Sequence, residues 1–137
     1  MTAESAAGTA TSPRTAPRVV VAAAALDVAL VLLFAGVGRG SHARDATVLG
    51  LFETAWPFLA GLAASWLLCA AWRRPFAPLR TGIPLWIGSV AIGMLLRLVA
   101  GSGTALAFVL VAAGTLAVLL VGWRGIAALV RRARTRR

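Results

Sequence analysis

Cysteine, acidic residues and lysine are all scarce in this sequence. Cys69 is the only cysteine, which excludes a disulfide framework or a cysteine-based zinc site within one chain. The sequence contains no nucleophile elbow, phosphate-binding loop, HExxH helix or dinucleotide-binding fingerprint. It therefore predicts no cofactor, no metal site and no catalytic residue that a local motif would identify.

Positive charge dominates the chain. Fourteen basic residues, all of them arginine, face four acidic ones, and the net charge is +10. In a soluble protein this balance would suggest a nucleic-acid partner. Here 60% of the residues are hydrophobic, and most arginines lie in short segments between long apolar runs, as in the cytoplasmic loops of membrane proteins. We interpret the chain as an integral membrane protein without a nucleic-acid partner.

Four apolar runs are long enough to cross a membrane, because about 20 helical residues span a hydrocarbon core of roughly 30 Å. The predicted fold class is all-α, an integral membrane bundle of four transmembrane helices. The transmembrane domain covers residues 18–127, between a disordered tail (1–17) and a basic C-terminal tail (128–137). A cleaved signal peptide is the alternative for the first run, which is long for that purpose and contains Asp27. The four predicted spans are 19–38, 47–72, 82–100 and 104–123.

The arginine distribution predicts the orientation in the membrane. The N-terminal part, the connector after the second run and the C-terminal part together hold eleven arginines, and the two opposite loops hold only Arg39 and Arg44. Both termini are therefore expected in the cytoplasm, N-in and C-in. Alanine-rich sequence with arginine in place of lysine indicates a GC-rich bacterial genome, so we expect the bacterial cytoplasmic membrane.

Two features predict how the spans bend and turn. Pro57 lies inside the second run, where it removes a backbone donor and predicts a kink. The segment 101–103 reads Gly-Ser-Gly, a tight turn that makes the third and fourth helices antiparallel neighbours.

Three ionisable side chains fall within the spans: Asp27, Glu53 and Arg97. Each costs roughly 2.5–3.5 kcal/mol at a helix centre, so each should face protein or water. At 1.5 Å per residue, Glu53 lies about 9 Å and Arg97 about 5 Å below the outer boundary, close enough to pair, and Asp27 lies deeper. We expect these residues on the inner faces of the bundle.

Together with the polar turn that follows the first span, these residues predict an outward-facing pocket. Asp27 would form its floor and the turn its rim. The alternative is that the charges only lock helices together, with Asp27 hydrogen-bonded to Ser89 or to a carbonyl. His42 has no second histidine or cysteine nearby, which favours a turn residue over a metal ligand. The candidate pocket residues are Asp27, Arg39, Ser41, His42, Glu53, Thr54 and Arg97.

Several segments resemble one known family. They read LDVALVLLF, GRGSH, TAWPFLAG and GMLLRLVAG, between Leu26 and Trp123. They are similar to small, chiefly actinobacterial four-helix membrane proteins grouped as the domain of unknown function three-zero-five-four. The resemblance implies a multi-pass membrane protein and no particular activity, and Glu53 matches it less well than its neighbours do. The matching positions are Asp27, Gly38, Arg39, Ser41, His42, Thr54, Pro57, Phe58 and Arg97.

The leading interpretation is a membrane protein that binds or passes a small solute, ion or proton through the pocket. Four helices rarely enclose a full pathway, so this interpretation predicts a homodimer in the lipid bilayer. The alternative is a structural or accessory subunit whose charges serve helix packing and partner docking. An enzyme acting on a lipid headgroup, with His42 and Asp27 or Glu53 as acid and base, ranks third. The C-terminal arginine cluster is expected to meet anionic lipid headgroups.

Overall fold

The computed structural model describes residues 15–40 and 47–136, and nearly all of them are helical. The long helices are α1 (Pro17–Gly40), α2 (Val48–Leu68), α3 (Ile83–Val99) and α4 (Leu106–Thr135). Each of the four is apolar and long enough to cross a membrane, α3 together with the helical turn Pro78–Gly82 that precedes it. This confirms the predicted all-α fold with four transmembrane helices. Ser41, His42, Arg44 and Asp45 lie outside the described residues, as does most of the tail expected to be disordered.

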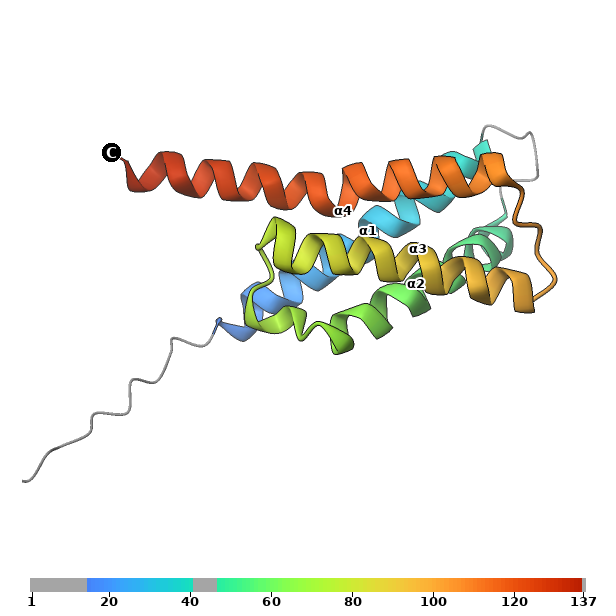
Figure 1. Ribbon diagram of the computed structural model, residues 1–137, viewed down its shortest axis with the longest axis horizontal. Helices are drawn as coiled ribbons and strands as arrows, with labels where there is room; N and C mark the ends of the chain where they lie inside the picture. Colours follow the sequence, from blue (N-terminus) through green and yellow to red (C-terminus); the bar gives the residue numbers. More distant parts are fainter. Residues whose placement is uncertain (1–14, 41–46, 137) are drawn as a thin grey trace, which may run out of the picture.

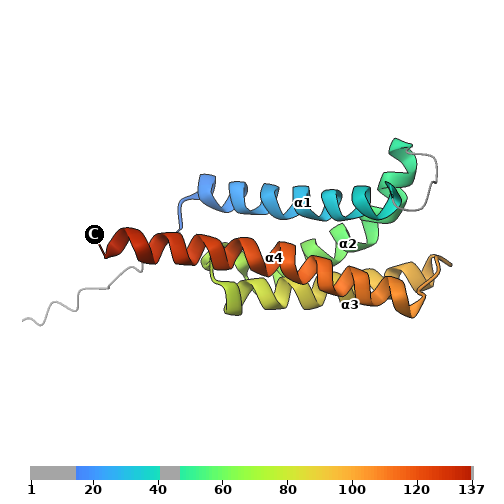
Figure 2. The same cartoon turned by 90° about the horizontal axis from the view of Figure 1, so that it is seen from above.

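The helices form an up-and-down bundle in which α1 also packs against α4 (Figure 1). The start of α1, the end of α4 and the connector between α2 and α3 lie together at one end, here called the arginine-rich end. The turn between α3 and α4 lies at the other end, here called the Gly101 end. Viewed from above, α1 and α4 are neighbours (Figure 2), and in Figure 1 α1 runs obliquely to α4.

The helix bounds differ from the predicted spans at the arginine-rich end. The second predicted span extended to residue 72, but α2 ends at Leu68 and a separate 3-10 turn, η1 (Ala71–Arg73), follows. Between them Ala70 adopts a left-handed conformation, which breaks the helix. A π-helical turn, η2 (Pro78–Gly82), leads into α3, and α4 continues to Thr135. The connector is thus a folded unit, and most of the basic tail is helical.

Local sequence accounts for the helix ends at the Gly101 end. The Thr47 side chain caps α2 by accepting a hydrogen bond from the Gly50 amide at 3.2 Å. Gly101 takes φ +70° after α3, and the amides of Gly101 and Ser102 donate to the carbonyls of Leu98 and Arg97. This is a Schellman motif, in which glycine adopts the left-handed conformation at little cost. It fixes the turn that the sequence predicted and leaves Arg97 one turn from the end of α3.

The helices enclose one apolar core. Phe34 of α1 meets Phe58 of α2 edge to face, with ring centroids 5.3 Å apart. Pro57 is buried inside α2, and the ribbon of that helix changes direction along its length (Figure 2). The fully buried aliphatic side chains come from all four helices and are Val31, Leu85, Leu116 and Leu120, with Leu62 nearly so.

Helices α2 and α3 approach most closely where small residues face each other. A Cβ atom added to Gly61 would lie 2.9 Å from the carbonyl oxygen of Ser89 and 3.1 Å from its Cα atom. Ser65 and Gly88 oppose each other in the same contact, where a Cβ on Gly88 would overlap the Ser65 hydroxyl. Small residues allow this approach, as is common between membrane helices.

We therefore expect Gly61→Ala to destabilise the fold, because the added methyl group meets backbone atoms that cannot rotate away. Overpacking of this kind costs about 1–3 kcal/mol. Gly114→Ala is the matched control, because no atom lies within 4 Å of the added carbon and alanine favours helix over glycine. Denaturant unfolding of both variants in mild detergent tests this, and equal stabilities would contradict the close packing of α2 and α3.

Candidate functional site

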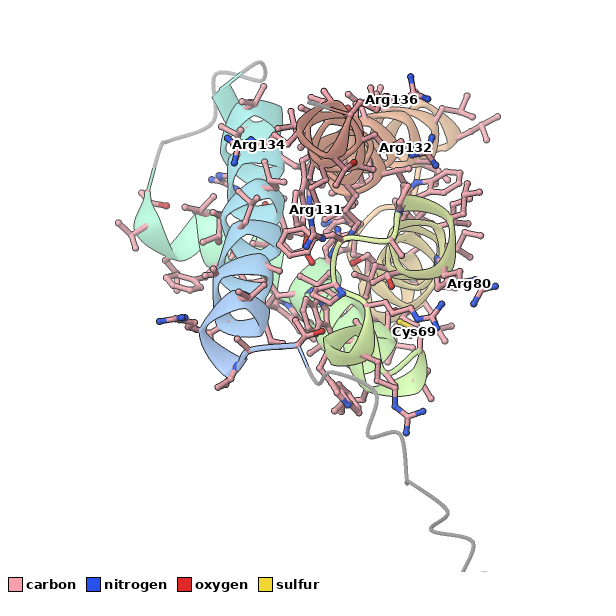
Figure 3. All side chains as sticks on the ribbon, turned by 90° about the vertical axis from the view of Figure 1, so that its left-hand side faces the viewer. Cys69, Arg80, Arg131, Arg132, Arg134 and Arg136 are labelled. Atoms are coloured by element: carbon pink, nitrogen blue, oxygen red, sulfur yellow. The ribbon has the colours of Figure 1, made fainter. Side chains whose placement is uncertain are left out.

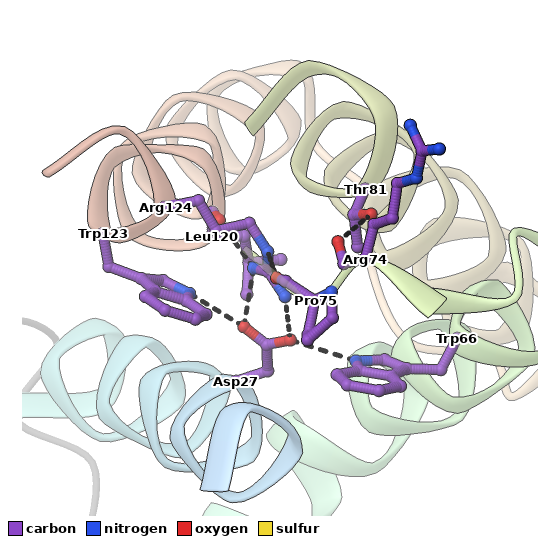
Figure 4. A network of polar contacts seen from close by, with 8 residues as sticks. All are labelled: Asp27, Trp66, Arg74, Pro75, Thr81, Leu120, Trp123 and Arg124. Atoms are coloured by element: carbon purple, nitrogen blue, oxygen red, sulfur yellow. Dashed lines mark hydrogen bonds and ion pairs between the residues drawn. The ribbon is translucent and has the colours of Figure 1, made fainter. Parts of the chain in front are cut away.

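A buried ion pair joins α1 to α4. Asp27 and Arg124 are both completely inaccessible to solvent. Nη2 of Arg124 lies 2.6 Å from Oδ2 of Asp27, and Nη1 lies 2.8 Å from Oδ1 (Figure 4). The two parallel contacts form the bidentate fork that makes arginine–carboxylate pairs strong and directional.

Two tryptophans complete the coordination of the carboxylate. The indole Nε1 of Trp66, on α2, donates to Oδ2 at 3.0 Å, and the indole Nε1 of Trp123 donates to Oδ1 at 3.0 Å. Asp27 thus accepts four hydrogen bonds, about as many as its two oxygens accommodate. The arrangement suits an ionised carboxylate, which accepts and does not donate.

The remaining donors of Arg124 reach backbone carbonyls. Its Nε donates to Pro75 in the connector at 2.9 Å, and Nη1 also donates to Leu120 at 2.8 Å. The guanidinium lies over the Trp123 ring, 4.5 Å from its centroid. A buried pair is tolerated when both partners are hydrogen-bonded in this way. The network therefore joins α1, α2, α4 and the connector at a single point.

Sequence reasoning did not identify Arg124. It was assigned to the cytoplasmic C-terminal part, although it is the only charged residue between Leu106 and Val130. Because α4 does not stop at residue 123, this arginine belongs to the bundle. The sequence did contain a signal for this pair: Asp27 is the single acidic residue of one apolar helix, and Arg124 is the single basic residue in the apolar part of another.

A cavity of about 500 Å³ opens near the Gly101 end of the bundle. Three of its lining residues belong to the predicted pocket: Arg39 near the end of α1, Thr54 on α2 and Arg97 on α3. The loop before α4 supplies Gly103 and Ala105. We call this cavity the arginine pocket. Its apolar lining comes from Phe34, Ala35, Gly38 and Phe108.

The two arginines are positioned by neighbouring groups. Nη1 of Arg39 donates to the Thr54 hydroxyl at 3.4 Å, and that hydroxyl donates to the Gly50 carbonyl at 3.1 Å. The guanidinium of Arg39 packs onto Gly50 so closely that a Cβ there would overlap it. Nη2 of Arg97 donates to the Gly103 carbonyl at 3.1 Å, and its guanidinium lies 4.4 Å from the centroid of Phe108.

The described lining of the arginine pocket is basic and apolar. Among the described residues that line it, none carries a carboxylate. Nε of Arg97 is buried and has no hydrogen-bond partner in the described part of the chain. A carbonyl and an aromatic ring stabilise the Arg97 guanidinium without cancelling its charge. The arrangement therefore presents positive charge and hydrogen-bond donors beside apolar walls.

The other predicted pocket residues lie elsewhere. Asp27 belongs to the buried network and does not line the cavity. Glu53 is exposed on α2, and the contacts described for Arg97 do not include it, so the expected Glu53–Arg97 pair does not form. The inner face of α2 includes Gly50, Thr54 and Phe58, and residues adjacent in a helix point about 100° apart. Ser41 and His42 lie outside the described residues.

The buried ion pair predicts that substitutions of Asp27 and Arg124 have non-additive effects on the free energy of unfolding. Asp27→Asn or Arg124→Gln alone should cost about 3–5 kcal/mol of unfolding free energy, because each leaves a buried charge without its partner. The double variant should cost clearly less than the two single costs combined. Glu53→Gln, which removes an exposed acid, is the control and should change stability by less than about 0.5 kcal/mol. Equilibrium unfolding in detergent measures all four, and additive single costs would argue against the pair.

Comparison with known proteins gives one match. A family described as a protein of unknown function (DUF3054) matches residues 24–127, about three quarters of the chain. No curated protein and no solved structure matches the sequence. The matched region contains the arginine pocket and both members of the ion pair, and it agrees with the resemblance found in the sequence. The chain belongs to this family of unknown function.

Proposed function

We propose that the protein binds a small anionic solute in the arginine pocket, on the outer side of a bacterial cytoplasmic membrane. The supporting observation is that Arg39 and Arg97 line one cavity from two helices, and that the buried Nε of Arg97 has no hydrogen-bond partner in the described part of the chain. Arginine offers several donors in a planar fork, which suits carboxylate, phosphate or sulfate groups. A cavity of about 500 Å³ falls within the usual range for small-molecule sites.

The outward placement rests on the positive-inside rule. Arg73, Arg74, Arg80 and the arginines of the last turns of α4 gather at the opposite end from the pocket. With that end and both termini in the cytoplasm, the Gly101 end faces outward. The terminal arginines would then face the anionic lipids of the inner leaflet.

Asp27 has a structural role in this proposal. Its carboxylate is saturated by Arg124 and two indoles, which leaves no acceptor position for an exchanging proton or cation. Between the arginine pocket and this network lie fully buried apolar side chains, including Val31, Phe58 and Leu116. These features favour binding over passage through one chain. Passage would require a rearranged bundle or the predicted homodimer.

The second candidate is an accessory subunit without a ligand. The satisfied Asp27–Arg124 network favours it, because the deepest charges then serve packing alone. Purification with one stoichiometric protein partner, in the absence of any anion effect on the pocket, is the result expected for this candidate.

Thiol labelling tests the anion site directly. In a Cys69→Ala background, Ala105→Cys places a thiol in the wall of the arginine pocket, and Ala107→Cys places one two residues further along, outside the lining. A membrane-impermeant maleimide added outside should label the first, and anions should slow its labelling but not that of the second. Inorganic phosphate, sulfate and acetate are added separately at constant ionic strength. An anion present at ten times its Kd should slow labelling about tenfold.

Arg97→Gln should abolish that protection while leaving the labelling rate without anion nearly unchanged. Gly50→Ala should weaken the protection of the thiol by the anion, because the added methyl group displaces the Arg39 guanidinium. Labelling of Ala105→Cys that no anion slows, or equal slowing of labelling at Ala107→Cys, would count against the anion site. Labelling only from the cytoplasmic side would overturn the orientation.

A further inference from the structure

A second basic cavity lies at the arginine-rich end, separate from the arginine pocket. Its volume is about 440 Å³, and its walls come from the start of α1, the connector and the last turns of α4. Arg73, Arg74 and Arg131 line it, and no acidic residue does among the described residues. We call it the connector crevice. Its other lining residues are Thr15, Ala16, Val19, Pro75 and Phe76.

We propose that the connector crevice is a specific binding site for the phosphate-bearing headgroup of an anionic phospholipid. The proposal concerns a different site from the anion pocket and does not depend on it. Three guanidinium groups from two separate segments line one crevice beside apolar walls. Arginine suits phosphate, and the apolar walls suit the glycerol and upper acyl region that free phosphate lacks.

The arginines of the crevice differ from others at the same end. The guanidinium of Arg131 lies 4.8 Å from the centroid of the Phe76 ring, which holds it over the connector. Figure 3 shows Arg131 between α1 and the connector, whereas Arg80, Arg132 and Arg136 point away from α1. Particular arginines therefore line the crevice in fixed positions, whereas the arginines of a diffuse basic tail would be interchangeable.

Contacts with the ion-pair network hold the walls of the crevice in place. Phe76 packs edge to face on Trp123, with centroids 5.7 Å apart, and Trp123 donates to Asp27. The Pro75 carbonyl accepts from Arg124, and the Thr15 hydroxyl donates to the Arg73 carbonyl at 3.2 Å. The ion-pair network thus anchors the connector, and the site does not have to be ordered by its ligand.

The depth of the crevice agrees with a lipid headgroup. If the hydrocarbon core begins at Leu106, about 20 helical residues carry α4 across it to Gly125. Arg131 then lies about 9 Å further along the helix axis, in or just beyond the headgroup layer. Val19 lies near the first turn of α1 at the same level, and the exposed ring of Trp72 adjoins Arg73, as expected of an interfacial aromatic residue.

The test is a lipid titration of the full-length protein in detergent, followed by native mass spectrometry. We expect one phosphatidylglycerol to bind saturably and at least tenfold more tightly than phosphatidylcholine. The crevice variant combines Arg73→Gln, Arg74→Gln and Arg131→Gln. Each arginine near an anionic surface contributes about fivefold to affinity, so this variant should lose at least about tenfold.

The matched control combines Arg80→Gln, Arg132→Gln and Arg136→Gln, which removes the same charge from the same end. Its affinity for phosphatidylglycerol should change less than about threefold, because these residues do not line the crevice. A second variant, Val19→Trp, keeps every arginine and fills the crevice, so it should also weaken binding at least about tenfold by steric exclusion. Thermal unfolding of each variant verifies that it is folded.

Three outcomes would overturn the proposal. Equal losses in the crevice and control variants would mean that only the total charge matters. Equal binding of phosphatidylglycerol and phosphatidylcholine would exclude selection for an anionic headgroup. Competition by inorganic phosphate at concentrations similar to those of the lipid would assign the site to free phosphate instead.

Discussion

The ion pair between Asp27 and Arg124 is the interaction on which the arrangement of the bundle most depends. Small residues bring α2 and α3 together, and a tight turn joins α3 to α4. Helices α1 and α4 are also in contact, although they are far apart in sequence. Where apolar helices face lipid, the hydrophobic effect gives little reason for one face to meet another. A buried acid and a buried base that require each other specify both which faces meet and at what height.

That constraint extends to the connector between α2 and α3. Arg124 donates to the Pro75 carbonyl and Trp66 donates to Asp27, so the connector and α2 are tied to the same point. Backbone hydrogen bonds within the connector, such as that from the Ala77 amide to the Arg74 carbonyl, form its local turns, and Arg124 ties these turns to a distant helix. The walls of the cavity at the arginine-rich end are consequently held by contacts with the network.

Much of the fold was predictable from the sequence, and the parts that were not share a physical cause. The number of helices and the turn at Gly101 follow from length, apolar content and glycine chemistry, which are local properties. The role of Arg124 depends on a partner 97 residues away, which a pass along the chain does not reveal. Glu53 was misplaced because Gly50 and Pro57, one turn away on either side, are buried, whereas Glu53 lies just beyond the edge of the inner face and is exposed. Arg39, Thr54 and Arg97, which the sequence analysis placed toward the same end of the bundle, line one cavity.

Arginines occur in three environments in this chain, which differ in the partners that stabilise the guanidinium. Arg124 is fully buried and is neutralised by a carboxylate. Arg73 and Arg74 of the connector are exposed and line a crevice together with Arg131. Arg97 lies within a span, and its described partners are a carbonyl and an aromatic ring. A partly buried charge in that position carries a desolvation cost, and a carboxylate would offset it, as Asp27 does for Arg124. A carboxylate thus offsets the desolvation cost of the guanidinium at Arg124, and no described carboxylate does so at Arg97. This contrast favours an anion from outside the chain as the partner of Arg97.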